Sequence, residues 1–147
     1  MEVAAEWGAD VTIDVGTHPS PEERLALVPD ATGGRGGDVV FELSGARTAI
    51  GEGIRLAAVN GRYLVAGTVG GDEQPILGHL IARRNLTIIG SLGAEIDAYY
   101  KALDLLRAER TRFDWNRLLG GRYSLDDATT ALRRMQDFSE TKAVLVP

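Results

Sequence analysis

The chain has 147 residues, enough for one domain with its own core, and its 44% hydrophobic and 25% charged residues are ordinary for a globular protein. Its net charge of −5 argues against a nucleic-acid partner, because surfaces that bind nucleic acid are basic. The absence of cysteine excludes disulfides and thiolate metal sites, and no leader-like segment or long apolar run occurs, so we expect a soluble, cytoplasmic protein that binds a small molecule and not a membrane.

The first part of the chain predicts a helix, a strand and a second helix. Residues 1–8 resemble the end of an amphipathic helix stopped by glycine, and the alternation of apolar and polar residues over 11–15 predicts a strand. A capping box with proline at the first helical position, Ser20-Pro21-Glu22-Glu23, predicts a helix from there to about Val28. Pro29 and Asp30, with the glycine cluster over 33–37, are expected to close that helix.

The middle of the chain predicts alternating strands and helices. Three short apolar runs over 38–43, 62–66 and 86–89 predict strands, and each is followed by glycine or serine. Residues 46–59 and 75–83 predict the helices between them. Since the carboxyl ends of parallel strands meet at one edge of a sheet, we expect a ligand to bind at the loops that follow these strands.

The last part of the chain predicts two amphipathic helices and a strand. A helix is expected over 95–110, with one buried face formed by Ala98, Ala102, Leu105 and Leu106. A second helix is expected from the Ser124 cap to about Phe138, with its inward face formed by Ala128, Ala131, Leu132 and Met135. Residues 143–146 predict a terminal strand, and the whole pattern predicts an α/β fold in three layers around a mostly parallel sheet.

Five strings in order and spacing carry a family resemblance: Ala5-Glu6-Trp7-Gly8-Ala9-Asp10, Gly37-Asp38-Val39-Val40-Phe41-Glu42, Asn60-Gly61-Arg62-Tyr63-Leu64-Val65-Ala66-Gly67, Arg84-Asn85-Leu86-Thr87-Ile88-Ile89-Gly90-Ser91 and Lys142-Ala143-Val144-Leu145-Val146-Pro147. The chain resembles the C-terminal portion of a medium-chain, zinc-type alcohol dehydrogenase, near the threonine and sorbitol dehydrogenase-like branches. This resemblance implies a truncated Rossmann-like domain over 1–147, with 1–115 derived from the Rossmann fold and 116–147 forming a C-terminal helix and strand.

The resemblance also implies where a nucleotide cofactor, NAD or NADP, would bind. The loop after the Phe-Glu strand lies by the adenosine ribose in the family, which corresponds to Leu43, Ser44 and Gly45. The next two strand ends supply backbone groups to the nicotinamide carboxamide, and they correspond to Gly67, Thr68 and Val69 and to Ser91, Leu92 and Gly93. A basic residue on the final strand can reach the pyrophosphate, which points to Lys142.

The chain also departs from the family. It has no Gly-x-Gly-x-x-Gly turn, and the resemblance implies that a missing N-terminal region would carry that turn, the catalytic zinc ligands and the acidic residue that holds the ribose. No zinc is therefore expected, and dinucleotide affinity should be weak. We expect a remnant NAD(P)-binding domain of an oxidoreductase rather than a self-sufficient dehydrogenase, and the sequence leaves open whether the chain is an enzyme.

Loss of the first two strands would leave the strand expected over 11–15 without a neighbour. Two arrangements are open: this strand pairs beside 38–43, or two chains complete each other's sheets. Pairing through the edge at 86–89 would also match the dimers common in the family. The expected partners are thus a second copy, in a homodimer joined at sheet edges, or a separate chain that supplies the missing half.

Asp14, Glu42 and His79 are the candidates for acid–base chemistry, since a carboxylate pair or an imidazole in a cleft can move protons. Each also has an ordinary structural explanation, in a loop cap, a local hydrogen bond or a surface helix. Two other functions stay open. One is redox-free chemistry, such as that of a lyase, isomerase or cyclase, in the vacated cofactor cleft, and the other is a non-catalytic dimeric scaffold.

Overall fold

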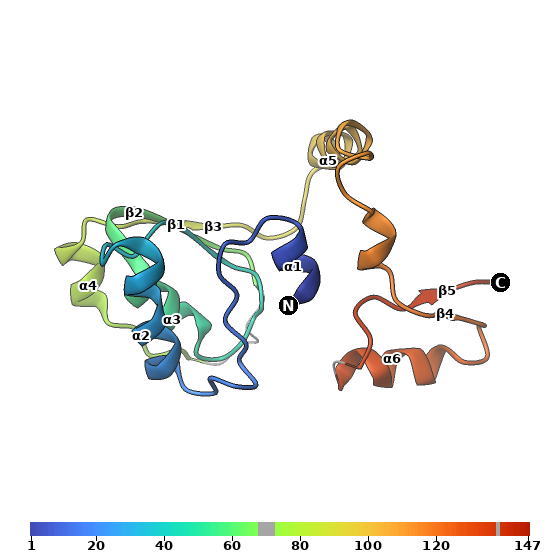
Figure 1. Ribbon diagram of the computed structural model, residues 1–147, viewed down its shortest axis with the longest axis horizontal. Helices are drawn as coiled ribbons and strands as arrows, with labels where there is room; N and C mark the ends of the chain where they lie inside the picture. The colour runs from blue at the N-terminus through green and yellow to red at the C-terminus, as the bar shows by residue number, and fades with distance from the viewer. Residues whose placement is uncertain (68–72, 138) are drawn as a thin grey trace. The chain divides into compact units, whose positions relative to one another are not determined.

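The computed structural model in Figure 1 describes residues 1–67, 73–137 and 139–147, in two compact units, Met1–Gly93 and Ala94–Pro147. None of the described helices is long and apolar enough to cross a membrane. The first unit contains α1 (Glu2–Glu6), α2 (Pro21–Thr32), β1 (Gly37–Glu42), α3 (Ala49–Leu56), β2 (Ala57–Val65), α4 (Gly78–Arg83) and β3 (Thr87–Gly90). The second contains α5 (Ile96–Ala108), the 3₁₀ helix η1 (Trp115–Leu118), β4 (Arg122–Tyr123), α6 (Ala128–Gln136) and β5 (Val144–Leu145).

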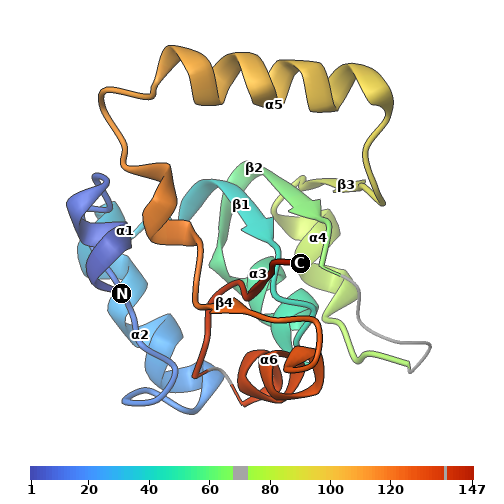
Figure 2. The same ribbon diagram turned by 90° about the vertical axis from the view of Figure 1, so that its right-hand side faces the viewer.

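The described strands of the first unit form a parallel sheet in the order β1–β2–β3 (Figure 2). In its register Phe41 lies beside Leu64, and Leu64 lies beside Ile89. α3 packs on β1 and β2, and α2 and α4 flank α3. The predicted α/β class with a parallel sheet is confirmed, and the carboxyl ends of the strands lie at one edge, as parallel pairing requires.

Tyr63 on β2 and Ile54 on α3 are the large side chains at the centre of the first unit, and both are fully buried. The Tyr63 hydroxyl donates a hydrogen bond to the carbonyl oxygen of Ala49 at 3.1 Å. Gly53 lies directly against the tyrosine ring, and a Cβ atom there would collide with it. Burial raises the pKa of Tyr63 to about 12, and the nearby carboxylates of Glu42 and Glu52 act in the same direction.

The junction between α3 and β2 differs from the prediction. Instead of a helix over 46–59, α3 ends at Leu56 and β2 begins at once. Arg84 donates from Nη1 to the carbonyl oxygens of Ile54, Arg55 and Ala57, at 3.3, 2.8 and 2.6 Å. The last carbonyls of a helix have no partner within the helix. Arg84, from a distant part of the sequence, therefore satisfies them and stabilises the end of α3 at this position.

Residues 11–15 do not form a strand, contrary to the prediction from their alternating pattern. They lead into a turn in which the His18 N–H donates to the Asp14 carbonyl oxygen at 2.9 Å. Among the described residues β1 pairs only with β2, so the arrangement with 11–15 beside 38–43 is also wrong. The physical reason is that alternation suits a strand but supplies no partner for its backbone groups.

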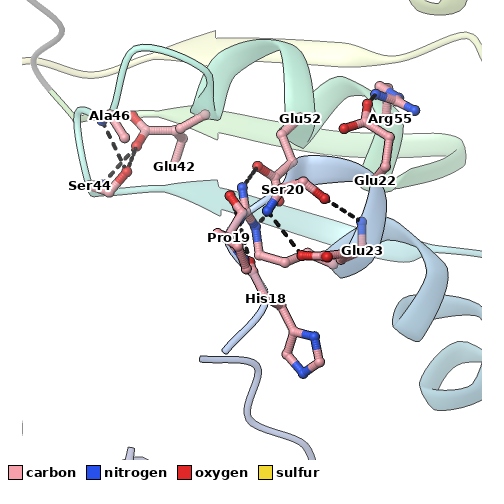
Figure 3. A network of polar contacts seen from close by, with 12 residues as sticks. His18, Pro19, Ser20, Glu22, Glu23, Glu42, Ser44, Ala46, Glu52 and Arg55 are labelled. Atoms are coloured by element: carbon pink, nitrogen blue, oxygen red, sulfur yellow. Dashed lines mark hydrogen bonds and ion pairs between the residues drawn. The ribbon is translucent and has the colours of Figure 1, made fainter. Parts of the chain in front are cut away.

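The N-terminus of α2 follows its prediction, and its C-terminus does not. Ser20 Oγ accepts from the Glu23 N–H, and the Glu23 carboxylate accepts from the Ser20 N–H, both at 3.2 Å, which completes the capping box (Figure 3). The helix continues through Pro29 to Thr32 and ends at Gly33, whose φ is +58°. Two glycines can adopt the left-handed turn that follows, so the helix stops there and not at the proline.

Several boundaries and buried faces also differ from the predictions. The helix expected from Pro75 begins at Gly78, and the expected end near Phe138 lies outside the described residues. α5 is a helix as predicted, but none of its residues is buried, so the expected inward face is wrong within this unit. On α6, Ala131 is buried but Leu132 is exposed. β5 pairs in parallel with β4, a short strand that the sequence did not predict.

Candidate functional site

Glu42 ends β1 and is buried, with 4% of its surface exposed. Its Oε1 accepts hydrogen bonds from the Ser44 N–H and the Ser44 hydroxyl, both at 2.7 Å, and from the Gly45 N–H at 2.8 Å. The Ser44 hydroxyl oxygen in turn accepts from the Ala46 N–H at 3.2 Å (Figure 3). Gly45 has a φ of +67°, in the region that glycine adopts readily. The loop predicted to bind the ribose is therefore wound around one carboxylate.

The surroundings of Glu42 lower its pKa. Burial alone would raise it, but the hydrogen bonds from Ser44 and Gly45 outweigh burial and bring the pKa below its ordinary value. Oε2 is buried and accepts no hydrogen bond from any residue that the structure describes. Glu42 is thus ionised at neutral pH and acts as a fixed acceptor, unlike a general acid, whose pKa lies near the working pH.

Replacing Glu42 with glutamine should lower the free energy of unfolding at pH 7 by about 1–2 kcal/mol, because the amide weakens charge-assisted hydrogen bonds. The pKa of Glu42 is lower in the folded state than in the unfolded state, where it is about 4.3. The ionised carboxylate therefore stabilises the fold fully above the unfolded-state pKa, and this stabilisation is lost as the pH falls through the folded-state pKa. Urea unfolding of both proteins between about pH 7 and pH 3 measures the difference, which should shrink on acidification. Glu95 is exposed, so Glu95→Gln is the control. If the difference in unfolding free energy between wild type and Glu42→Gln did not change with pH, the ionised carboxylate of Glu42 would not be its cause.

Backbone hydrogen bonds tie the ends of the three strands together. The Gly67 N–H, after β2, donates to the carbonyl oxygen of Glu42 at 2.9 Å, and the Ser91 N–H, after β3, donates to that of Val65 at 2.9 Å. Gly67 lies so close to the Glu42 carboxylate and the Gly45 N–H that a Cβ atom there would overlap both. The structure therefore brings the predicted residues Gly45, Gly67 and Ser91 to one edge of the sheet.

The other residues predicted to contact a cofactor fall into three groups. Leu43 and Leu92 are largely exposed at the same edge, and Gly93 has a φ of +69°. Thr68 and Val69 lie outside the described residues. Lys142 belongs to the second compact unit, where its carbonyl oxygen accepts from the Gly120 N–H at 2.7 Å. Its contact with a pyrophosphate stays a prediction.

The candidates for acid–base chemistry lie on different elements. Asp14 is exposed, and its Oδ1 accepts from the Gly16 N–H at 2.8 Å. His79 is exposed near the start of α4. Within the described residues no hydrogen bond or ion pair between side chains joins Asp14, Glu42 and His79 to one another. The catalytic role of each stays a prediction.

A cavity of about 430 Å³ lies beside Glu42, between β1 with its following loop and helices α2 and α3. Arg24 forms one wall, donating to the two carboxylate oxygens of Glu52 at 2.8 and 2.6 Å and to the carbonyl oxygens of His18 and Pro19 at 2.7 and 2.9 Å. The Arg24–Glu52 pair was not predicted, because its members lie on separate helices and no local pattern joins them. Because the positive charge of Arg24 is paired with the negative charge of Glu52, this wall of the cavity carries almost no net charge.

A resident zinc ion does not fit the described part of the chain. The full sequence has no cysteine and two histidines. Among residues 1–67, 73–137 and 139–147, no three His, Asp or Glu side chains are grouped so that they could hold a metal ion.

Comparison with known proteins gives matches that cover nearly the whole chain at about 30% identity. The chain is 32% identical to 5-exo-hydroxycamphor dehydrogenase of Pseudomonas putida over 146 residues, which are 99% of this chain and 40% of that protein. It is 31% identical to the L-threonine 3-dehydrogenase of Symbiobacterium thermophilum over 151 residues, covering 100% of this chain and 41% of the relative. The chain thus spans about two fifths of the length of these curated relatives.

Solved structures agree with the sequence matches. The crystal structure of an alcohol dehydrogenase from Thermotoga maritima superposes with a TM-score of 0.82 at 29% identity, over 99% of this chain and 40% of that one. Residues 1–108 match the family described as zinc-binding dehydrogenase. The chain belongs to this family and corresponds to its C-terminal, nucleotide-binding portion.

Proposed function

We propose that this chain is the cofactor-binding part of an NAD(P)-dependent dehydrogenase that acts on an alcohol, and that the dinucleotide lies across the carboxyl edge of β1, β2 and β3. One observation supports the proposal most directly in a chain of this family. The backbone hydrogen bonds of Gly67 and Ser91 bring the starts of the three predicted cofactor loops together at that edge. Ligands of open parallel sheets bind at this edge.

In this arrangement the loop of Leu43, Ser44 and Gly45 would hold the adenosine ribose. The backbone groups that follow β2 and β3 would hold the nicotinamide carboxamide. Glu42 would keep the first loop rigid through its bonds to Ser44 and Gly45, because a preorganised loop loses less entropy when a ligand binds. The cofactor, when bound, supplies the hydride acceptor, and the described residues supply no zinc site to polarise the substrate.

Redox-free chemistry in the cavity receives less support from Glu42. Its carboxylate is ionised and held by three hydrogen bonds, whereas a general acid needs a pKa near the working pH. A cytoplasmic location and a homodimer joined at sheet edges remain predictions from the sequence.

Calorimetric titration with NADH and NADPH at millimolar concentration tests the proposal. We expect saturable binding of at least one of them, with an accompanying rise in the thermal midpoint. Leu43→Asp should weaken this binding about tenfold, because it places a carboxylate in the loop predicted to lie by the ribose of a negatively charged dinucleotide, at a position where the leucine side chain is 70% exposed.

Leu125→Asp is the matched control, since Leu125 is also an exposed leucine and is not among the residues predicted to contact the cofactor. It should leave the affinity unchanged. Absence of saturable binding with either nucleotide, or an equal loss of affinity in both variants, would contradict the proposed function.

A further inference from the structure

Another cavity lies at the amino edge of the three-stranded sheet, opposite to the edge of the predicted cofactor loops. Its volume is about 130 Å³, and its lining includes Gly36 just before β1, Ala57 at the start of β2 and Arg84 shortly before β3. The charged residues of its lining, as far as the structure describes the chain, are the arginines Arg35, Arg55 and Arg84. A small cavity walled by guanidinium groups favours a negatively charged occupant.

Among the described residues, two of these three positive charges have no carboxylate partner. The Arg35 side chain forms no hydrogen bond or ion pair with the described part of the chain. Arg84 uses Nη1 for the three carbonyl oxygens at the end of α3, and its Nε and Nη2 have no partner among the described residues. Arg55 pairs with Glu22 at 2.9 Å, but Glu22 does not line the cavity (Figure 3). The cavity wall therefore carries excess positive charge.

Backbone contacts hold the loop that carries Arg35 in place. Thr32 Oγ1 accepts from the Gly36 N–H at 3.1 Å and donates to the Val28 carbonyl oxygen at 2.8 Å. Gly36, with a φ of +85°, lies so close to the Leu56 carbonyl oxygen that a Cβ atom there would overlap it. These contacts join the loop to α2 on one side and to the junction of α3 and β2 on the other, so the cavity is built into the backbone.

The carbonyl groups at the two nearby helix ends do not cancel this positive charge. At the end of α2, the carbonyl oxygens of Pro29 and Thr32 accept from the N–H groups of Gly34 and Arg35, at 2.8 and 3.3 Å. The C-terminus of a helix is equivalent to about half a negative charge. Two helix ends and the Glu22 carboxylate therefore amount to about two negative charges against three arginines.

We propose that this cavity binds a phosphate group, either as inorganic phosphate or as part of a small phosphate monoester. Its volume is about four times the roughly 30 Å³ that a water molecule occupies, which suits one tetrahedral oxyanion. Planar guanidinium groups also match phosphate oxygens in pairs. A bound phosphate would join α2, α3 and the end of α4, and so stabilise the first unit. This inference goes beyond the proposed function and does not depend on dinucleotide binding.

Calorimetric titration with sodium phosphate, and separately with methyl phosphate, tests the proposal in a chloride buffer at constant ionic strength. We expect saturable binding of one ion per chain. Phosphate also stabilises proteins without binding, because it is excluded from their surface. The rise in thermal midpoint should therefore level off over the same concentrations as the heat of binding. The ligand that binds more tightly shows whether the site takes the free anion or a monoester.

Arg35→Gln removes an arginine that has no side-chain partner among the described residues, so it should weaken phosphate binding about tenfold and leave the thermal midpoint in phosphate-free buffer unchanged. Arg35→Lys keeps the charge without the planar group and should recover part of the affinity. Arg62→Gln is the matched control. Arg62 is also exposed, but it precedes Tyr63, whose ring packs on α3, so its side chain points to the other face of the sheet.

The proposal would be overturned if the heat of binding did not saturate, or if Arg35→Gln and Arg62→Gln bound phosphate equally well. An equal, unsaturated rise in thermal midpoint in all variants would assign the effect to exclusion of the salt, and would overturn it too. Arg35→Gln should leave the affinity for NADH unchanged, and Leu43→Asp should leave the affinity for phosphate unchanged. Failure of cofactor binding and failure of phosphate binding are therefore distinguishable.

Discussion

Replacing Tyr63 with alanine should lower the free energy of unfolding by about 3–5 kcal/mol, the usual cost of emptying a large, fully buried aromatic position. Tyr63 joins the centre of β2 to α3, through its packing on Gly53 and its hydrogen bond to the Ala49 carbonyl oxygen. Because a domain of this size is stable by only about 5–15 kcal/mol, the loss should be severe. Urea unfolding followed by circular dichroism should show a midpoint lower by more than about 1 M.

Tyr63→Phe is the matched control, because it keeps the ring in the core and removes only the hydroxyl. It should cost about 1 kcal/mol, the net worth of one hydrogen bond. If alanine and phenylalanine had the same effect, the ring would not be the feature that holds α3 on the sheet. If neither changed the midpoint, Tyr63 would not belong to the core at all.

The strands of the first unit could be predicted from sequence because each signal is local. Short apolar runs that end in glycine or serine mark β1, β2 and β3, and the order of strands and helices implies a parallel sheet. The capping box at Ser20 is local as well, and its geometry is as expected. The loops at the carboxyl ends of the strands could therefore be placed before the structure was known.

The remaining errors concern contacts between distant residues. The end of α3 depends on Arg84, whose three bonds to carbonyl oxygens no pattern within 46–59 can reveal. The segment 11–15 has the composition of a strand, but strand formation depends on a neighbour that a local pattern cannot supply. The spacing of apolar residues on α5 predicts a helix, but it does not show which element covers them. The prediction of a buried face on α5 was therefore wrong within this unit.

The candidate site was only partly predictable for the same reason. Glu42 could be singled out as a carboxylate at a strand end, but its three hydrogen bonds depend on how the Ser44 and Gly45 loop turns back on it. Because of these bonds, we interpret Glu42 as a fixed hydrogen-bond acceptor and not as a general acid. The close approach of Gly67 to Gly45 has a sequence signal, a glycine after each strand, although the signal does not say that the two glycines meet.

Replacing Arg24 with alanine should cost about 2–3 kcal/mol of unfolding free energy. The substitution leaves the Glu52 carboxylate without its partner beside the cavity and removes donors from the carbonyl oxygens of His18 and Pro19. Fully enclosed ion pairs cost about 3–5 kcal/mol to break, and this pair, with its side chains 14% and 12% exposed at an open cavity, should cost less.

A double-mutant cycle separates the pair from its surroundings. Glu52→Gln alone and Arg24→Ala alone should each destabilise the chain, and the two together should cost less than the sum, because neither leaves an unpaired charge when the other is present. The exposed Arg55–Glu22 pair, at 2.9 Å between the same two helices, is the matched control and should show little coupling. Additive effects at Arg24 and Glu52 would mean that the contacts of Arg24 with the carbonyl oxygens of His18 and Pro19, and not its ion pair with α3, account for its contribution to stability.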